Sequence, residues 1–265
     1  MVLAESSVNR RNGSAAGALI VNADDWGRDH ETTTRTLECI RLGTVSSVSA
    51  MVFMADSERA AAMAREHDID AGLHLNLTTA LSAPNLPAEL VKHQNRLASY
   101  LRRPLAVAVF HPGLIRSFES VVAAQIREFH RLYGTGPDRL DGHHHVHLCP
   151  NVLIGGLLPA GTIVRRNFSF MPGEKSLANR LFRRLMDRIL ARRHRLVDLF
   201  VSLAPLDPPE RLRRIVSLAR RFVVEMETHP VNPEEYRFLT GGEMFRLLGD
   251  LPIASRFAVP PSGRV

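Results

Sequence analysis

The chain has 265 residues, of which 45% are hydrophobic and 23% are charged, and its formal net charge is +7. This composition is typical of a soluble globular protein whose length suffices for one large domain with a full-sized core. The sequence has no run of 18 or more apolar residues and only two cysteines, which excludes a transmembrane helix and a disulfide framework. We therefore expect a cytoplasmic protein.

The chain begins with a polar segment, residues 1–17, which lacks the apolar core of a secretory signal and is interpreted as a flexible tail. A single domain is expected over residues 18–258, followed by a short C-terminal tail at 259–265. Within the domain, short apolar runs rich in β-formers alternate with longer segments of helical periodicity. The expected strands are 18–23, 45–52, 69–77, 139–145, 162–168, 196–203 and 222–228. The expected helices are 31–42, 56–67, 87–108, 117–133, 174–193, 207–220 and 241–249. Such alternation predicts a parallel α/β fold, and a closed or nearly closed βα barrel is favoured over an open sheet.

Polar residues gather at the ends of the expected strands. The first strand runs into Asp24 and Asp25, the third contains His74, the fourth ends in a histidine cluster, and the last ends at His229. In βα barrels the chemistry lies at the carboxyl ends of the strands, where side chains distant in sequence share one rim. We therefore expect these groups to form one site. Taken alone, His74 and His229 would each be interpreted as half-buried histidines with satisfied hydrogen bonds.

The histidine cluster lies in the segment DGHHHVHLCP, residues 141–150, which holds four of the chain's 12 histidines. In an extended segment, His143, His145 and His147 would share one face and His144 would point the other way. Such spacing suits imidazole ligands of a divalent metal, although exposed loop histidines are an alternative. Asp141 could accept a hydrogen bond from an imidazole N–H and so fix its tautomer.

The adjacent carboxylates Asp24 and Asp25 would point to opposite faces of a regular strand. They can reach the same site only where the strand gives way to a turn, and Gly27 supplies a residue suited to that turn. A helix N-cap or an Asx-turn is the alternative interpretation. Beside a cation, one carboxylate could act as a ligand while the other accepts a proton.

Other catalytic signatures are missing from the sequence. It contains no G-x-S-x-G elbow, no H-E-x-x-H, no Walker A loop, and no G-x-G-x-x-G after a strand. These absences disfavour serine hydrolases, zincins, and nucleotide- or dinucleotide-binding enzymes.

A basic segment at residues 179–195 contains seven arginines and one aspartate. Its apolar residues recur at helical spacing, which predicts an amphipathic helix with a basic outer face. Two interpretations are open: a solvated surface helix, or peripheral contact with an anionic membrane surface or another polyanion. No nucleic-acid-binding module accompanies the segment, so no nucleic-acid partner is expected. The sequence leaves the oligomeric state open, a homo-oligomer included.

The motifs NADDWG, GLHLNLT, DGHHHVHLCP and METHP, in that order, resemble those of the YdjC-like carbohydrate deacetylases, whose branches include chitooligosaccharide and hopanoid-associated deacetylases. The resemblance runs from about residue 19 to 230. It implies an α/β fold that is a distorted, incomplete (βα) TIM-like barrel in a single domain. It also implies removal of an acetyl group from an N-acetylated amino sugar, either a free oligosaccharide or a lipid-linked glycoside.

The resemblance further implies residue roles. One divalent metal ion, Mg²⁺ or Zn²⁺, would be bound by Asp25, His74 and His143. Asp24 would be the catalytic base, and His229 would act on the departing amine.

Three more residues would contact the substrate, namely His145, His147 and Arg165. The chain departs from the family pattern at Trp26, where Phe is usual, and in the loop GRDHETT, which puts the substrate rather than the metal site in question. Alternatives are a metal-dependent hydrolase of another amide or phosphoester bond, and a non-catalytic metal- or sugar-binding protein.

Overall fold

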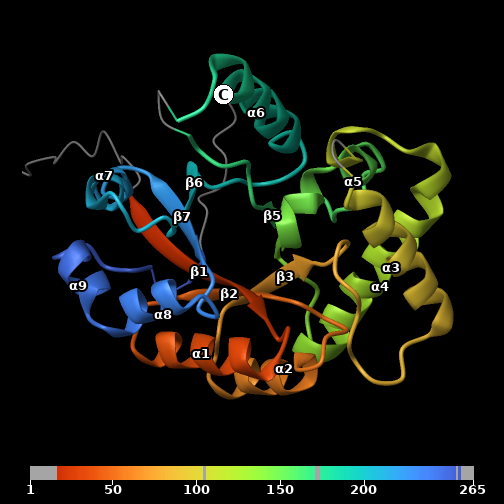
Figure 1. Ribbon diagram of the computed structural model, residues 1–265, viewed down its shortest axis with the longest axis horizontal. Helices are drawn as coiled ribbons and strands as arrows, with labels where there is room; N and C mark the ends of the chain where they lie inside the picture. Colours follow the sequence, from red (N-terminus) through yellow and green to blue (C-terminus); the bar gives the residue numbers. More distant parts are fainter. Residues whose placement is uncertain (1–16, 104–105, 171–173, 255, 258–265) are drawn as a thin grey trace, which may run out of the picture.

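The computed structural model describes residues 17–103, 106–170, 174–254 and 256–257 (Figure 1). Most of the predicted N-terminal tail and all of the predicted C-terminal tail lie outside the described residues. The boundaries proposed for the domain, 18–258, therefore stay a prediction.

Seven parallel strands form one curled sheet in the order β5-β4-β3-β2-β1-β7-β6. The strands are β1 (Ala18–Trp26), β2 (Ser47–Ala50), β3 (Ala71–Leu75), β4 (Arg139–Gly142), β5 (Ile163–Val164), β6 (Leu199–Ser202) and β7 (Val223–Thr228). This order is that of a βα barrel opened between β5 and β6, where a single parallel bridge joins Ile163 to Arg195. The predicted fold class, an incomplete TIM-like barrel in a single domain, is confirmed.

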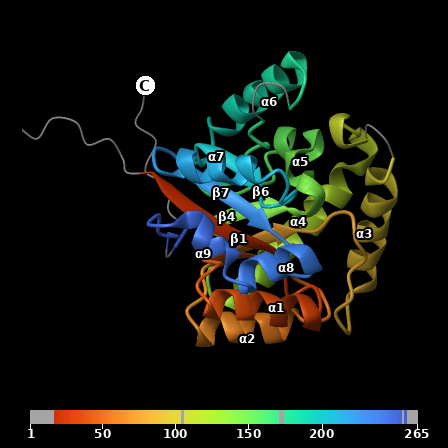
Figure 2. The same ribbon diagram turned by 60° about the vertical axis from the view of Figure 1, so that its left-hand side comes forward.

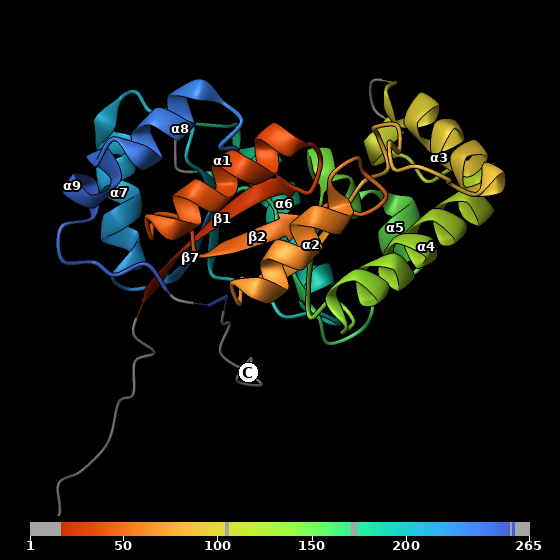
Figure 3. The ribbon, with the colours of Figure 1, turned by 90° about the horizontal axis from the view of Figure 1, so that it is seen from below.

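The helices surround this sheet, and most of them cover its outer face (Figures 1 and 3). The longer ones are α1 (His30–Arg41), α2 (Ser57–Glu66), α3 (Ala88–Leu101), α4 (Ile115–Tyr133), α6 (Leu177–Leu190) and α7 (Pro209–Ala219). The shorter ones are α5 (Pro150–Ile154), α8 (Pro233–Thr240) and α9 (Glu243–Leu248), with 3-10 turns at Ala106–Ala108, Pro112–Leu114 and His143–Leu148. In the described part of the chain, no helix is both long and apolar enough to cross a membrane.

The two faces of the sheet differ in polarity because side chains alternate along each strand. On β1, Leu19, Val21 and Ala23 point outward into the main apolar core beneath the helices. The alternate residues face the interior of the barrel. Ile20 belongs to a small apolar cluster there, whereas Asn22 and Asp24 are buried polar groups nearer the carboxyl end of the strand. Apolar and polar groups thus both face the interior, and the polar ones include the residues at the carboxyl end of β1, where a site is expected.

Three sequence predictions require correction. The helix expected over 87–108 ends at Leu101, and the chain has Pro104 shortly beyond, a residue that disfavours helix in its predecessors. The strand expected over 139–145 ends at Gly142, and His143–Leu148 is a 3-10 segment with two left-handed residues. The helices α5 and α8 were not expected.

The orientation of the basic helix also differs from the prediction. The sequence predicts a basic outer face, yet in α6 the side chains of Leu181, Phe182 and Leu185 are more than half exposed. Only Asp187 and Leu190 of this helix are buried. The outward face of α6 is therefore apolar, with arginines beside it.

Candidate metal centre

The carboxyl end of β1 brings two neighbouring carboxylates to one site. Asp25 has φ of 65°, in the left-handed region, and the register between β1 and β2 shifts between Ala23 and Trp26. In a regular strand successive side chains point to opposite faces, but this bulge interrupts that alternation. Asp24 and Asp25 can therefore both reach the carboxyl end of the barrel interior. Gly27 follows with φ of 87° and turns the chain towards α1. The sequence predicts that the strand gives way to a turn at Asp24 and Asp25, whereas the structure brings them together at a bulge inside β1, which continues to Trp26.

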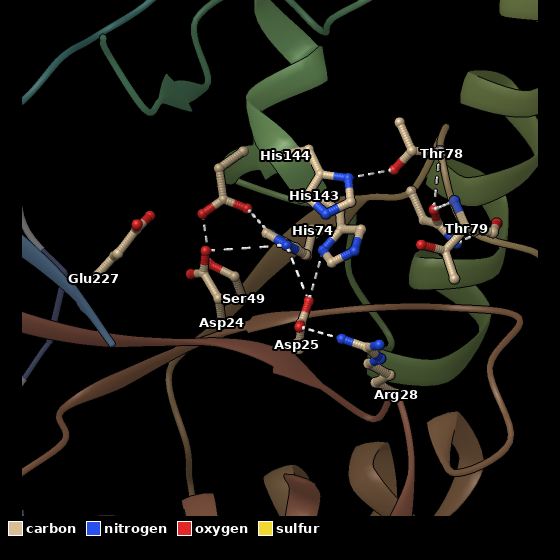
Figure 4. A network of polar contacts seen from close by, with 12 residues as sticks. Asp24, Asp25, Arg28, Ser49, His74, Thr78, Thr79, His143, His144 and Glu227 are labelled. Atoms are coloured by element: carbon tan, nitrogen blue, oxygen red, sulfur yellow. Dashed lines mark hydrogen bonds and ion pairs between the residues drawn. The ribbon is translucent and has the colours of Figure 1, made fainter. Parts of the chain in front are cut away.

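Asp25 meets two histidines, one on β3 and one directly after β4 (Figure 4). Its Oδ1 lies 3.0 Å from His143 Nδ1 and 3.4 Å from His74 Nε2. All three side chains are buried, and their donor atoms lie within 4.8 Å of one another. The two imidazoles hold the pKa of Asp25 well below its usual range, against the opposing effect of burial.

The second oxygen of Asp25 is held by Arg28. The Nη1 atom of Arg28 donates a hydrogen bond of 2.9 Å to Asp25 Oδ2, so that Oδ1 is the oxygen turned towards the histidines. Although it is buried, Oδ1 has no partner in hydrogen-bond geometry. An oxygen and two imidazole nitrogens that converge without bonding one another fit a divalent cation placed among them.

His74 is oriented by a carboxylate behind it. Its Nδ1 lies 2.7 Å from Asp141 Oδ1, and Ser49 Oγ donates to Asp141 Oδ2 at 2.5 Å. Because Nδ1–H donates a hydrogen bond to Asp141, Nε2 is the nitrogen that faces Asp25, and it can ligate a metal once it has lost its own proton. The imidazole that Asp141 fixes is therefore that of His74. Burial opposes a charge on His74, but Asp24 and Asp141 outweigh it and raise the pKa to about 10.

Asp24 lies beside the metal-ligand candidates and is held from the other side by Arg165. Its Oδ2 is 4.0 Å from His74 Nε2, while Arg165 donates one hydrogen bond of 2.7 Å to each oxygen of Asp24. Burial disfavours the charged form of Asp24, yet the guanidinium and His74 hold its pKa below the usual value. The carboxylate is therefore ionised.

A second cluster of donor atoms, from Asp24, His74 and Asp141, also lies close together. Arg165 already compensates this cluster, because its Nη2 lies 2.8 Å from Asp141 Oδ2 in addition to its bonds to Asp24. In the cluster around Asp25, the guanidinium of Arg28 bonds Oδ2 instead and leaves Oδ1 turned towards the two histidines. The fit to a metal is therefore better at Asp25, His74 and His143.

The structure gives the following contacts for three more predicted site residues. His145 is about one third exposed and packs edge-on against Phe168 with ring centroids 4.7 Å apart. His147 is fully buried, and its Nε2 lies 2.9 Å from the backbone oxygen of Arg165. His229 follows β7 and is partly exposed, and its backbone N–H donates to Glu235 Oε2 at 2.9 Å.

The expected extended geometry of the histidine cluster is wrong. His144 and His145 have φ of 54° and 57°, so the segment turns at each of them. His143 and His147 are buried as a result, while His144 lies towards solvent and its Nδ1 contacts Thr78 Oγ1 at 3.0 Å. Of the cluster, His143 is therefore the residue that faces Asp25, and the alternation of an extended chain does not explain why.

Sequence reasoning missed two acids on β7. Glu225 Oε1 accepts a hydrogen bond of 2.7 Å from Arg165 Nε, and Glu227 Oε2 lies 3.4 Å from Arg165 Nη1. Burial raises the pKa of Glu225 to about 7, and burial together with Asp24 raises the pKa of Glu227 well above its usual value. Their spacing of two residues in VVEMET, among apolar neighbours, was the signal that both face the barrel interior.

A cavity of about 760 Å³ lies between the segment after β5 and the connection from β6 to α7. Its wall includes Phe168, whose ring also contacts His145 and Phe200. The cavity therefore shares Phe168 with the packing around His145.

Comparison with known proteins agrees with the sequence motifs. The sequence model of the YdjC-like protein family matches residues 18–245. The chain is 34% identical over 140 residues to a chitooligosaccharide deacetylase of Serratia marcescens, which covers 51% of this chain and 52% of that protein. It is also 34% identical over 137 residues to a carbohydrate deacetylase of Mus musculus, covering 51% and 44% of the two chains. The chain thus matches about half the length of the curated relatives.

One solved structure shares the fold. A protein from Enterococcus faecalis V583, provisionally named for cleavage of cellobiose phosphate, superposes with a TM-score of 0.65 at 21% sequence identity. The superposition covers 91% of this chain and 97% of the other.

Proposed function

Because the chain belongs to the YdjC-like protein family, we propose that it is a metal-dependent hydrolase that removes the acetyl group from an N-acetylated amino sugar. The names of the relatives from Serratia marcescens and Mus musculus support the deacetylase activity and the sugar class of the substrate.

The observation that carries the proposal is an ionised carboxylate beside a three-residue metal site. Asp25, His74 and His143 converge within 4.8 Å. Asp24, 4.0 Å from His74 Nε2, stands outside this set. A site built for binding alone needs no additional carboxylate there, whereas hydrolysis of an amide needs a group that accepts a proton from water.

In the proposed reaction each of these residues would have a separate role. Asp25, His74 and His143 would hold Zn²⁺ or Mg²⁺, and the two imidazoles among these donors favour zinc. When bound, the cation would polarise the acetamide carbonyl and lower the pKa of water. Asp24 would accept the proton of the attacking water at Oδ2. His229 would give a proton to the departing amine.

Around these groups we assign supporting roles. Arg165 and His147 are buried, which favours a role in positioning Asp24 over the direct substrate contact expected from the sequence. Arg165 donates a hydrogen bond to each oxygen of Asp24, and His147 contacts the backbone oxygen of Arg165. His145, on the partly exposed side next to Phe168, is placed to contact the sugar.

The test of the base assignment is Asp24→Asn. This variant should retain bound metal and lose deacetylation by on the order of 10²–10⁴, the usual cost of removing a catalytic proton acceptor. The measurement is acetate release from a panel of N-acetylated sugars, with Asp250→Asn as an isosteric control at an exposed carboxylate. Normal acetate release by Asp24→Asn would refute the role.

The test of the metal site is a comparison of metal content. Asp25→Ala and His74→Ala should lower the metal that purifies with the protein, and a chelator should abolish acetate release by the wild type. Wild-type protein that binds metal but releases no acetate from any sugar in the panel would favour hydrolysis of another bond or binding alone. Wild-type protein that is fully active without metal would refute metal dependence.

A further inference from the structure

The helix α6 presents an apolar surface to solvent instead of to the sheet. Its exposed apolar side chains, each more than 40% exposed, are Leu177, Leu181, Phe182, Leu185 and Ile189. At 100° per residue these five positions fall within about 140° of one another, so they share one side of the helix. Figures 1 and 2 show the helix standing away from the body of the barrel.

Arginines form the edge of this apolar stripe. Arg180, Arg184 and Arg188 follow one another at spacings of four and so lie in a row along the helix. The helix contains a single acidic residue, Asp187, and this side chain is buried. The exposed surface of α6 therefore combines apolar and cationic groups without an exposed carboxylate.

Asp187 fixes the opposite side of the helix to the barrel. Its Oδ2 accepts hydrogen bonds of 3.0 and 2.7 Å from Arg166, and its Oδ1 accepts from the backbone and side-chain N–H groups of Asn167, each at 3.0 Å. These residues directly follow Arg165. The outward orientation of the apolar stripe is thus set by buried polar contacts with the strand segment that leaves the site.

We propose that α6 docks the protein on an anionic lipid bilayer, with its apolar side chains in the interface and its arginines at the lipid phosphates. A second copy of the chain is a poorer occupant, because its arginine row would approach this one. A nucleic acid would satisfy the arginines but would leave the leucines and Phe182 in water. A bilayer that carries negative charge satisfies both kinds of group.

The experiment is co-sedimentation of the full chain with vesicles. Phosphatidylcholine vesicles containing about one third phosphatidylglycerol should bind the wild type, and vesicles of phosphatidylcholine alone should bind it much less. Leu181→Glu with Leu185→Glu should abolish binding. Arg184→Gln with Arg188→Gln should lower the partition coefficient by roughly fivefold for each arginine removed. Phe245→Glu, at an apolar side chain of α9 that is 49% exposed, is the matched control and should bind normally.

Two kinds of result would overturn the proposal. One is that the wild type does not bind anionic vesicles. If in that case the wild type is a dimer that Leu181→Glu with Leu185→Glu turns into monomers, the apolar side of α6 is covered by a second copy of the chain. The other is binding that these two substitutions leave unchanged. Thermal melting of each variant checks that it folds. All variants should release acetate from a soluble substrate at the wild-type rate, which separates this proposal from the catalytic one.

Discussion

Arg165 is the residue on which the charges inside the barrel depend. Its guanidinium contacts four carboxylates, those of Asp24, Asp141, Glu225 and Glu227. One positive charge cannot neutralise four negative ones. The raised pKa values of Glu225 and Glu227 indicate that these two acids take up protons more readily, while Asp24 and Asp141 stay ionised. The forked geometry of arginine suits this arrangement, because it gives each oxygen of Asp24 its own donor.

Arg165→Lys tests this role of the guanidinium. A lysine keeps the charge but cannot donate to both oxygens of Asp24, so the pKa of Asp24 should rise. In the proposed reaction Asp24 must be ionised to accept a proton, so the acidic limb of kcat/KM should move to higher pH, and kcat should fall. The measurement is the pH profile of acetate release, with metal content determined in parallel.

The control for this variant is the same change one residue further on. Arg166→Lys alters a partly exposed side chain that binds Asp187 of α6, and the pH profile should stay as in the wild type. An unshifted acidic limb in Arg165→Lys would mean that Arg165 does not set the pKa of Asp24.

Among the secondary-structure elements, β1 is the one whose carboxyl end brings Asp24 and Asp25 together. Its bulge depends on the left-handed backbone of Asp25 and on Gly27 just after it. A Cβ atom at Gly27 would lie 3.1 Å from the backbone oxygen of Met51 and 3.2 Å from the Cβ of Ala60. Both the backbone angle and the space around it therefore require glycine.

Gly27→Ala should destabilise the protein and reduce its metal content. A left-handed alanine costs about 1–2 kcal/mol, and the crowding against Met51 adds to this. Gly43→Ala is the control, because Gly43 has φ of 77° with nothing within 4 Å of the added Cβ. Denaturant unfolding should show a larger loss for Gly27→Ala than for Gly43→Ala. Equal losses, with metal content retained, would show that the turn after β1 does not depend on this packing.

The elements that could be predicted from sequence are those whose residues carry a local periodic signal. All seven strands lie within or overlap the expected ranges, because their apolar runs alternate with helical segments, and β1 was placed to within three residues of its end. The convergence of Asp24, Asp25, His74 and His143 also followed from the sequence, because carboxyl ends of parallel strands share one rim.

The remaining features depend on contacts between distant segments. The turns at His144 and His145 are left-handed, a conformation that no local pattern in HHHVH indicates. The outward face of α6 follows from the tie between Asp187 and the segment after β5, which the periodicity of the helix does not reveal. The interior acids Glu225 and Glu227 were readable from their spacing, but their shared partner Arg165 lies about 60 residues away in sequence.

For the whole molecule, the charged interior couples stability to pH and to metal. His74 has a pKa of about 10 in the folded protein against 6.5 ordinarily. A raised pKa stabilises the fold below pH 6.5, and this contribution is lost as the pH rises towards 10. Glu225 and Glu227 act in the same direction, since their pKa values are also raised.

The metal-free protein should therefore lose stability between pH 6.5 and 10, and metal should reverse the trend. A cation must displace the proton of His74, so the apparent affinity should rise by about tenfold per pH unit below pH 10. Denaturant unfolding with chelator and with metal, at several pH values, measures both effects. His74→Asn should flatten the metal-free profile and abolish the gain from metal. A metal affinity that is independent of pH would contradict the assignment of His74 as a ligand.

The residues assigned to the cation and the residues that line the cavity belong to different parts of the barrel. The residues assigned to the cation come from β1, β3 and the end of β4, which are linked by continuous strand pairing through β2. The wall beside the cavity is made instead by connecting segments such as the one containing Phe168 and the one leading from β6 to α7. Substitutions in that wall could therefore change the range of substrates of the proposed reaction while the residues assigned to the cation stay the same.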